Sequence, residues 1–255
     1  MESKNTDKLV AKFITEIDNI HLPSVVNPYL DNPPEIAQIA AKELQNYLEN
    51  LNDVDHNFGL DSQNTNPIIG KMFGVLVVKD SEGNIGYLSA FSGKLGGSNV
   101  HDRFVPPIYD MLSSTGFITD GMMSLKQLSD QIEKAKSENL VHKVQALKKQ
   151  RANLSKHLQS LLFEEYHIMN DVLETKNIVT LFKDKGYKQP PSAAGECAAP
   201  KLLQYAFQMK LKPIAIAEFW WGLSPKSDKW RHKEFYPACE SKCRPILSYM
   251  LGALA

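Results

Sequence analysis

Three cysteines are the residues of this sequence whose type and spacing best suit chemistry. All of them fall in the last 59 of its 255 residues, with Cys197 in one segment and Cys239 and Cys243 four residues apart in another. Apolar periodicity predicts a helix over 197–209 and a second over 239–251, so each cysteine segment opens a helix. Because the free N–H groups and positive dipole end of a helix start lower the pKa of a thiol, thiolates at such positions are good metal ligands.

We therefore predict that the three thiolates converge on one metal ion, with zinc as the candidate. Zinc prefers four ligands, and His232 or a water molecule is the candidate for the fourth position. No histidine of the chain occurs in an H-x-x-x-H pattern. The alternative interpretation is that the cysteines pack as small apolar side chains, as most free cysteines do.

Composition bounds the class of protein. The chain has 43% hydrophobic and 23% charged residues, and its 29 basic and 29 acidic residues balance. This balance gives the whole chain no attraction to nucleic acid or membrane, so any such attraction must be local. An odd number of cysteines argues against a disulfide framework, and neither a signal peptide nor a membrane-spanning run is evident. We expect a cytoplasmic protein.

The elements that position the cysteines follow from local patterns. Residues 35–51 have helical periodicity after a Pro-Pro pair, and 72–78 and 85–91 are β-rich runs joined by a turn, which predicts a hairpin. Residues 213–221 predict one more strand. We expect a single α/β (α+β) domain over 1–255, with a small mixed sheet flanked by helices. Residues 1–34 are predicted as an irregular leader with a short helix near 9–17.

A long helical insertion is predicted over 123–170. Residues 124–170 contain neither glycine nor proline, and their apolar residues recur every three to four positions. The pattern fits one long helix or a helical hairpin with a break near 137–139, and self-association through 124–170 is a further interpretation. No acidic residue occurs from 140 to 163, and a basic face of this kind is able to bind RNA phosphates. The candidate RNA-binding residues are Lys143, Lys148, Lys149, Arg151 and Lys156.

The order of elements resembles the zinc nucleoside-deaminase fold. In that family one helix begins with [His/Cys]-x-Glu and the next with Pro-Cys-x-x-Cys, and the glutamate shuttles protons for a zinc-bound water. Here Ala199 stands where that glutamate would be, and three residues instead of two separate Cys239 and Cys243. Without the carboxylate the acid–base step has no carrier, so the resemblance favours a structural metal over a catalytic one.

Several longer segments resemble the amino-terminal extension of a subgroup of RluA-type RNA pseudouridine synthases. The resemblance runs from about residue 20 to the end of the chain. Its segments are Ala41–Leu48, His56–Gly59, Ile69–Val78, Ile85–Gly93, Arg103–Pro107, Gly195–Phe207, Ala217–Gly222 and Phe235–Cys239. It implies an accessory domain beside a synthase domain that converts uridine to pseudouridine in tRNA or rRNA.

The synthase domain itself is absent from this sequence. Its catalytic aspartate belongs to an H-R-L-D-type motif, and no Arg-Leu-Asp occurs in the chain. We therefore expect no isomerase activity from the chain alone, and either a synthase domain beyond Ala255 or a stand-alone relative of the extension. A divergent zinc-dependent deaminase-like hydrolase and a helical protein-interaction scaffold are the alternative functions.

Overall fold

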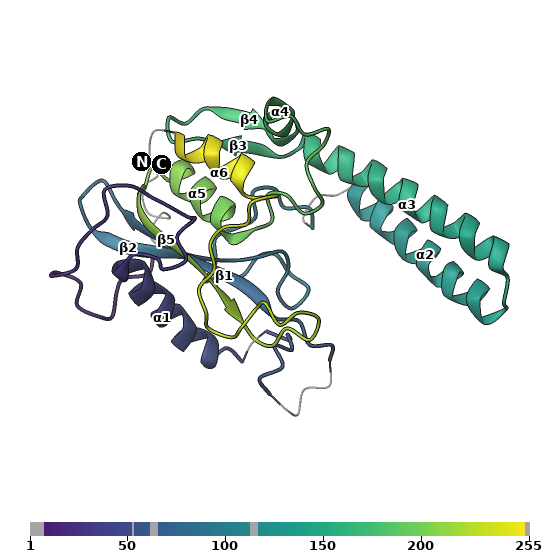
Figure 1. Ribbon diagram of the computed structural model, residues 1–255, viewed down its shortest axis with the longest axis horizontal. Coiled ribbons are helices and arrows are strands. Elements are labelled where there is room, and N and C mark those ends of the chain that lie inside the picture. The colour runs from purple at the N-terminus through teal and green to yellow at the C-terminus, as the bar shows by residue number, and fades with distance from the viewer. Residues whose placement is uncertain (1–7, 53, 62–65, 113–116, 253–255) are drawn as a thin grey trace. The chain divides into compact units, whose positions relative to one another are not determined.

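The computed structural model describes residues 8–52, 54–61, 66–112 and 117–252 (Figure 1). Contacts divide the chain into two compact units. Unit 1 comprises Met1–Ile108 and His167–Ala255, and unit 2 comprises Tyr109–Tyr166. Unit 2 therefore interrupts unit 1 in the sequence, and both of its limits lie before those of the helical insertion predicted over 123–170. The α/β fold class predicted from the sequence is confirmed.

A three-stranded sheet forms the centre of unit 1. Its strands are β1 (Lys71–Lys79), β2 (Ile85–Phe91) and β5 (Lys212–Trp221), in the order β2-β1-β5. The turn between β1 and β2 is set by Asp80, whose Oδ1 accepts the N–H groups of Glu82 and Asn84 at 2.9 Å each. Both pairings of β1 are antiparallel, whereas the sequence predicted a mixed sheet.

Helices cover both faces of this sheet (Figure 1). Helix α1 (Glu35–Glu49) packs on one face, where Phe73, Phe219 and Trp221 join its apolar side chains in a continuous core. Helix α5 (Ala198–Gln208) packs against all three strands from the other face. Gly74 permits this contact, because a Cβ at Gly74 would lie 3.0 Å from that of Ala198.

The remaining elements of unit 1 hold the carboxyl-terminal helix against α5. A two-stranded antiparallel sheet joins β3 (His167–Met169) to β4 (Thr175–Asn177), and α4 (Ile178–Asp184) follows at once. Helix α6 (Arg244–Leu251) contacts both α4 and α5, and its side chains Ile246, Leu247 and Met250 are fully buried. The burial of this apolar face is what fixes the position of the segment that carries Cys239 and Cys243.

Unit 2 is a helical hairpin of α2 (Phe117–Ser137) and α3 (Val141–Glu164). The break predicted near 137–139 is confirmed by a tight turn in which Asn139 has a φ of 56°. Leu128, Ile132, Ala135 and Leu147 form the buried seam between the helices. Self-association through 124–170 stays a prediction. The hairpin already buries part of its apolar surface within one chain.

Two local predictions were wrong. No helix forms near 9–17 within the described part of the leader, residues 8–34; instead Ala11 makes an antiparallel bridge to Tyr87 on β2. Pairing with the sheet thus overrides a weak helical pattern. The second concerns the residues after Asp171, whose apolar pattern predicts a helix. They form a turn and strand β4, and the chain becomes helical only from Ile178, where the Asn177 side chain caps α4. Within the described residues, none of the helices combines the length and apolarity that crossing a membrane requires.

Candidate metal centre

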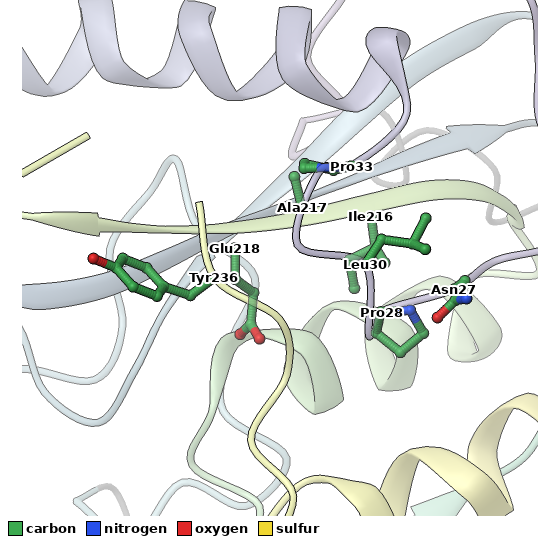
Figure 2. Close-up of a pocket in the computed structure, with 8 residues that line it drawn as sticks. All are labelled: Asn27, Pro28, Leu30, Pro33, Ile216, Ala217, Glu218 and Tyr236. Carbon is green, nitrogen blue, oxygen red and sulfur yellow. The ribbon is translucent and has the colours of Figure 1, made fainter. Parts of the chain in front are cut away.

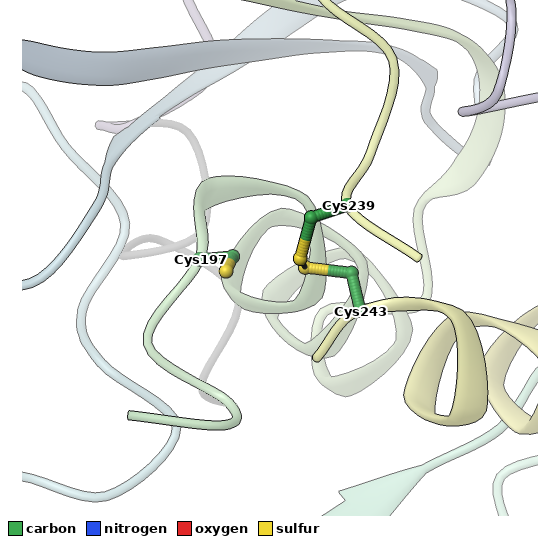
Figure 3. Close-up of side chains that lie close together, drawn as sticks. All are labelled: Cys197, Cys239 and Cys243. Atoms are coloured by element: carbon green, nitrogen blue, oxygen red, sulfur yellow. Dashed lines mark hydrogen bonds between the residues drawn. The ribbon is translucent and has the colours of Figure 1, made fainter. Parts of the chain in front are cut away.

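The three cysteines converge in unit 1. Their Sγ atoms all lie within 4.8 Å of one another, and the Sγ atoms of Cys239 and Cys243 are 3.4 Å apart. Figure 3 shows the sulfurs of Cys239 and Cys243 pointing toward one another from the segment that leads into α6, with Cys197 beside them at the start of α5. All three are free thiols. The convergence predicted from the sequence is therefore present.

Local backbone structure explains how the thiols meet. Cys197 is the N-cap residue of α5, as the sequence pattern predicts. Helix α6 begins at Arg244 with Cys243 as its N-cap residue, five residues after the predicted start at Cys239. Between Cys239 and Cys243 the chain makes one helical turn, in which the Cys243 N–H donates to the Cys239 carbonyl at 3.2 Å. Residues four apart on such a turn point to the same side, which explains why three intervening residues still bring two sulfurs together.

The thiols strongly influence one another's protonation. Thiol hydrogen bonds from Cys197 and Cys243 lower the pKa of Cys239, and the backbone N–H groups of Lys242 and Cys243 act in the same direction. The pKa of Cys197 is raised, first by its hydrogen bond to Cys239, and that of Cys243 is raised by Cys197 and Cys239. Cys239, the exposed member, is therefore the thiol of the cluster that ionises most readily, and a divalent cation would favour the ionised form of all three.

The size of the cluster suits zinc. Zinc–sulfur bonds of about 2.3 Å at tetrahedral angles place sulfur ligands about 3.8 Å apart. The spacing here, 3.4 Å for one pair and at most 4.8 Å for the others, requires only small rotations of the side chains. No other His, Cys, Asp or Glu of the described residues joins this group. A bound ion would consequently have three protein ligands and a fourth position open to water, which is an arrangement typical of catalytic zinc.

His232 does not belong to the cluster, which corrects the predicted protein ligand. Its Nδ1 accepts the Gly222 N–H at 3.0 Å, and its ring contacts that of Trp221 with centroids 4.4 Å apart. Trp221 faces the core beneath α1, on the opposite side of the sheet from α5. The path of the loop after β5, which the sequence did not reveal, thus carries His232 to the wrong face.

Glu218 on β5 is a residue of this site that sequence reasoning missed. It is 8% exposed, and its Oε1 accepts the Ala199 N–H at 3.0 Å in the first turn of α5. Burial raises the pKa of Glu218 to about 7, the Ala199 hydrogen bond opposes this, and the charge of Cys239 adds to it. The sequence does contain a pattern that could have indicated this residue, because Glu218 is the single carboxylate in the otherwise apolar run 213–221. Glutamate is seldom buried in a strand unless its carboxylate is paired or hydrogen-bonded.

A buried lysine offsets the negative charge of the site. Lys201 is 2% exposed, and its Nζ lies 3.4 Å from a Glu196 carboxylate oxygen and 3.3 Å from the Phe91 carbonyl oxygen. Burial lowers the pKa of Lys201, while Glu196 and Cys197 raise it. The ammonium therefore lies where it favours ionised Cys197.

The five basic residues predicted to bind RNA lie on α3 in unit 2. All five are exposed, and among the ion pairs of the described residues none involves them. At about 100° per residue, Lys149 and Lys156 fall on the side of α3 away from its apolar seam, and Lys148 lies about a quarter turn from the seam. Lys143 and Arg151 flank the seam, and Arg151 donates across the hairpin to the Ser129 hydroxyl at 2.8 Å. The structure therefore separates Lys148, Lys149 and Lys156 from the two residues beside α2.

Comparisons with known proteins give no match from which a function of this chain could be inferred. No family model, no curated protein and no solved structure matches the chain. What the fold and site define is a class, an α/β domain in which two helix starts bring three thiols together. The particular function has to be proposed from the geometry and charge of that site.

Proposed function

We propose that this chain is a zinc-binding domain that holds one ion through Cys197, Cys239 and Cys243. The observation that carries the proposal is the convergence of three sulfurs from two separate helix starts, within 4.8 Å of one another. Soft thiolate ligands favour zinc over the hard cations magnesium and calcium, which bind oxygen. The lowered pKa of Cys239 and the Lys201 ammonium that acts on Cys197 support the ionised thiols that such binding requires.

Metal analysis of protein purified without chelator tests this proposal. We expect about one zinc per chain, and less than about 0.1 in each of the single variants Cys197→Ser, Cys239→Ser and Cys243→Ser. Ser241→Ala is the matched control, because Ser241 is exposed on the same turn and outside the cluster. Less than about 0.1 zinc per chain in the wild type contradicts the proposal, as does retention of zinc in the serine variants.

A second candidate function is that of an accessory domain which contacts RNA beside an RluA-type pseudouridine synthase. The sequence segments quoted above motivate it, and the exposed, unpaired lysines of α3 support it. Helix α3 carries five basic residues and a single acidic one, Glu164, at its end, whereas α2 carries three of each sign. The positive charge of unit 2 is therefore concentrated on one helix, as phosphate binding requires.

Charge reversal on the hairpin tests RNA contact. The triple variant of Lys148, Lys149 and Lys156 to Glu is compared with a control triple of Lys126, Lys134 and Lys136 to Glu on α2, which changes the net charge equally. We expect the first variant to weaken tRNA or rRNA stem-loop binding and to reduce the slope of log K against log salt by about 2 to 3. Equal effects of both triples, or no binding at low salt, contradict a role for α3.

The sequence of the gene beyond the codon for Ala255 tests the proposed link to a pseudouridine synthase. An H-R-L-D-type motif in frame after the codon for Ala255 would support the parent activity. A different domain at that place would contradict it.

A further inference from the structure

Cys239 and Cys243 face each other across a single turn of the chain. Their Sγ atoms are 3.4 Å apart, and the dashed line in Figure 3 marks the hydrogen bond between these thiols. The Cys243 and Arg244 N–H groups both donate to the Cys239 carbonyl at 3.2 Å, which closes the turn. Because a disulfide joins its sulfurs at about 2.05 Å, the two Sγ atoms need to approach by only about 1.4 Å. Bond formation therefore requires no distant parts of the chain to come together.

The two thiols differ in their access to solvent. Cys239 is exposed, whereas Cys243, the N-cap residue of α6, is 1% exposed. The susceptibility of a thiol to oxidation follows its exposure, so an oxidant from solution reacts first with Cys239. Cys243 is sheltered from direct attack but lies within reach of the Cys239 sulfur. This combines an accessible attacking thiol with a resolving thiol beside it.

The segment before Cys239 is anchored to two other parts of unit 1. The Tyr236 N–H donates to the Glu218 carbonyl on β5 at 3.0 Å, and the Ala238 N–H donates to the Pro28 carbonyl of the leader at 2.8 Å. Three of these residues also line a small cavity, which is shown in Figure 2 and has a volume of about 10 Å³. That is the space of about one water molecule, so this cavity has no room for an organic substrate. The anchored backbone thus holds Cys239 against its neighbour, and the exposed side of Cys239 is the approach for a small oxidant.

We propose that Cys239 and Cys243 are a redox-sensitive pair that a hydroperoxide converts to an intramolecular disulfide. The disulfide itself requires no metal, and only its effect on zinc rests on the zinc site proposed above. Bound zinc and this disulfide exclude each other, because a disulfide sulfur is no longer the thiolate that zinc binds. Oxidation removes two of the three ligands, so the chain holds zinc under reducing conditions and releases it under oxidising ones.

The reaction balances with the hydroperoxide as the oxidant. The Cys239 sulfur attacks one peroxide oxygen, so that an S–O bond forms and the O–O bond breaks. The thiol proton goes to the departing oxygen, which leaves as water or an alcohol. The Cys243 sulfur then attacks the sulfenic sulfur, an S–S bond forms, the S–O bond breaks, and the departing hydroxide takes the second thiol proton and leaves as water. The two thiols lose two electrons, and the peroxide gains both.

Reduction takes place from the same exposed side. A small thiol attacks the Cys239 sulfur of the disulfide, forms a mixed disulfide with it and releases the Cys243 thiol. A second thiol molecule then frees Cys239. Exposed disulfides are the labile and regulatory ones, so this pair acts as a switch and not as a permanent cross-link.

Mass spectrometry of the full chain after tryptic digestion tests the pair, because trypsin places each cysteine in a different peptide. Cys197 falls in 189–201, Cys239 in 234–242, and Cys243 opens the next peptide. The wild type is freed of metal with a chelator, treated with hydrogen peroxide and digested without reductant. We expect peptide 234–242 joined to the peptide that begins at Cys243, two hydrogens lighter than their sum, and separation of the two by dithiothreitol.

Serine variants assign the roles of the three thiols. Cys197→Ser is the matched control, since it removes the third thiol of the cluster and should keep the cross-link. Cys239→Ser should slow the oxidation of Cys243 by at least about tenfold, because the sheltered sulfur then lacks its reactive partner. Cys239 is exposed, and circular dichroism verifies that this variant folds. A cross-link that includes Cys197 instead, or sulfinic and sulfonic acids on Cys239 without any cross-link, overturns the pair.

The zinc-loaded wild type tests the effect of oxidation on the metal. With hydrogen peroxide and a chromogenic chelator present, we expect about one zinc released for each disulfide formed, and renewed zinc binding after reduction. Zinc that stays bound after the cross-link has formed overturns the exclusion. A cross-link in a protein that binds no zinc when reduced contradicts the zinc site and supports the redox pair. Absence of the cross-link overturns the redox pair whatever the zinc content.

Discussion

Replacing Glu218 by glutamine should remove a pH dependence of stability that the structure builds into β5. Burial raises the pKa of this carboxyl from its ordinary value of 4.5 to about 7 in the folded chain. Below pH 4.5 it is protonated in both folded and unfolded chains. Between the two values only the unfolded chain releases the proton, so the free energy of unfolding falls as the pH rises, and above about pH 7 the loss is complete.

The size of the effect follows from the two pKa values. At about 1.4 kcal/mol for each pH unit, the folded chain loses about 3 kcal/mol of stability between pH 4.5 and pH 8 through this one group. Glutamine does not titrate, and its amide oxygen still accepts the Ala199 N–H. Thus the free energy of unfolding of Glu218→Gln, relative to that of the wild type, should rise by about 3 kcal/mol between pH 4.5 and pH 8.

Urea unfolding with EDTA present, followed by tryptophan fluorescence, measures this difference at pH 4.5, 6 and 8. Because the charge of Cys239 also acts on Glu218, the comparison is repeated in a Cys239→Ser background, where that coupling is absent. The control Glu240→Gln should differ from the wild type by less than about 0.5 kcal/mol, because its side chain is 68% exposed. A difference between wild type and Glu218→Gln that stays constant across these pH values would refute the argument that burial controls Glu218.

Three further predictions concern packing and metal release. Gly74→Ala should lower the free energy of unfolding in urea by about 1 to 3 kcal/mol and should also lower the affinity for zinc. The reason is that the new Cβ would lie 3.0 Å from the Ala198 Cβ and 3.2 Å from Leu202 Cδ1. An unchanged affinity for zinc would mean that α5 does not position Cys197. Leu202→Ala should cost about 2 to 5 kcal/mol, since Leu202 is fully buried, and a loss below about 1 kcal/mol in the same assay would contradict the packing described. Lowering the pH should release zinc as protons compete for the thiolates, which a chromogenic chelator records, and zinc held with unchanged affinity at pH 4 would rule out thiolate ligands.

The elements that carry the site could be predicted because their signals are local. The runs 72–78 and 85–91 are apolar and β-rich, and Asp80 provides the turn, so the β1–β2 hairpin needs no distant information. Pro200 in the first turn of α5 and the apolar face that follows likewise mark that helix start. Two helix starts with cysteines then pointed to one cluster.

The residues that were missed depend on long-range pairing. Glu218 reaches Ala199 only because β5 pairs with β1 and presents that position to α5, and a register shift between Val77 and Val78 determines which residues of β5 face each side. Such a register is decided by the whole sheet and cannot be read from one strand. His232 was misplaced for the same reason, since the loop after β5 returns beneath α1, where Trp221 and Lys233 hold it.

The central claim, a three-cysteine zinc centre with one open position, is tested most directly by zinc K-edge X-ray absorption on the purified protein. We predict three sulfur scatterers at about 2.3 Å and one oxygen or nitrogen scatterer at about 2.0 to 2.1 Å from the zinc. Four sulfurs, or a shell of nitrogen and oxygen alone, would contradict the site described above.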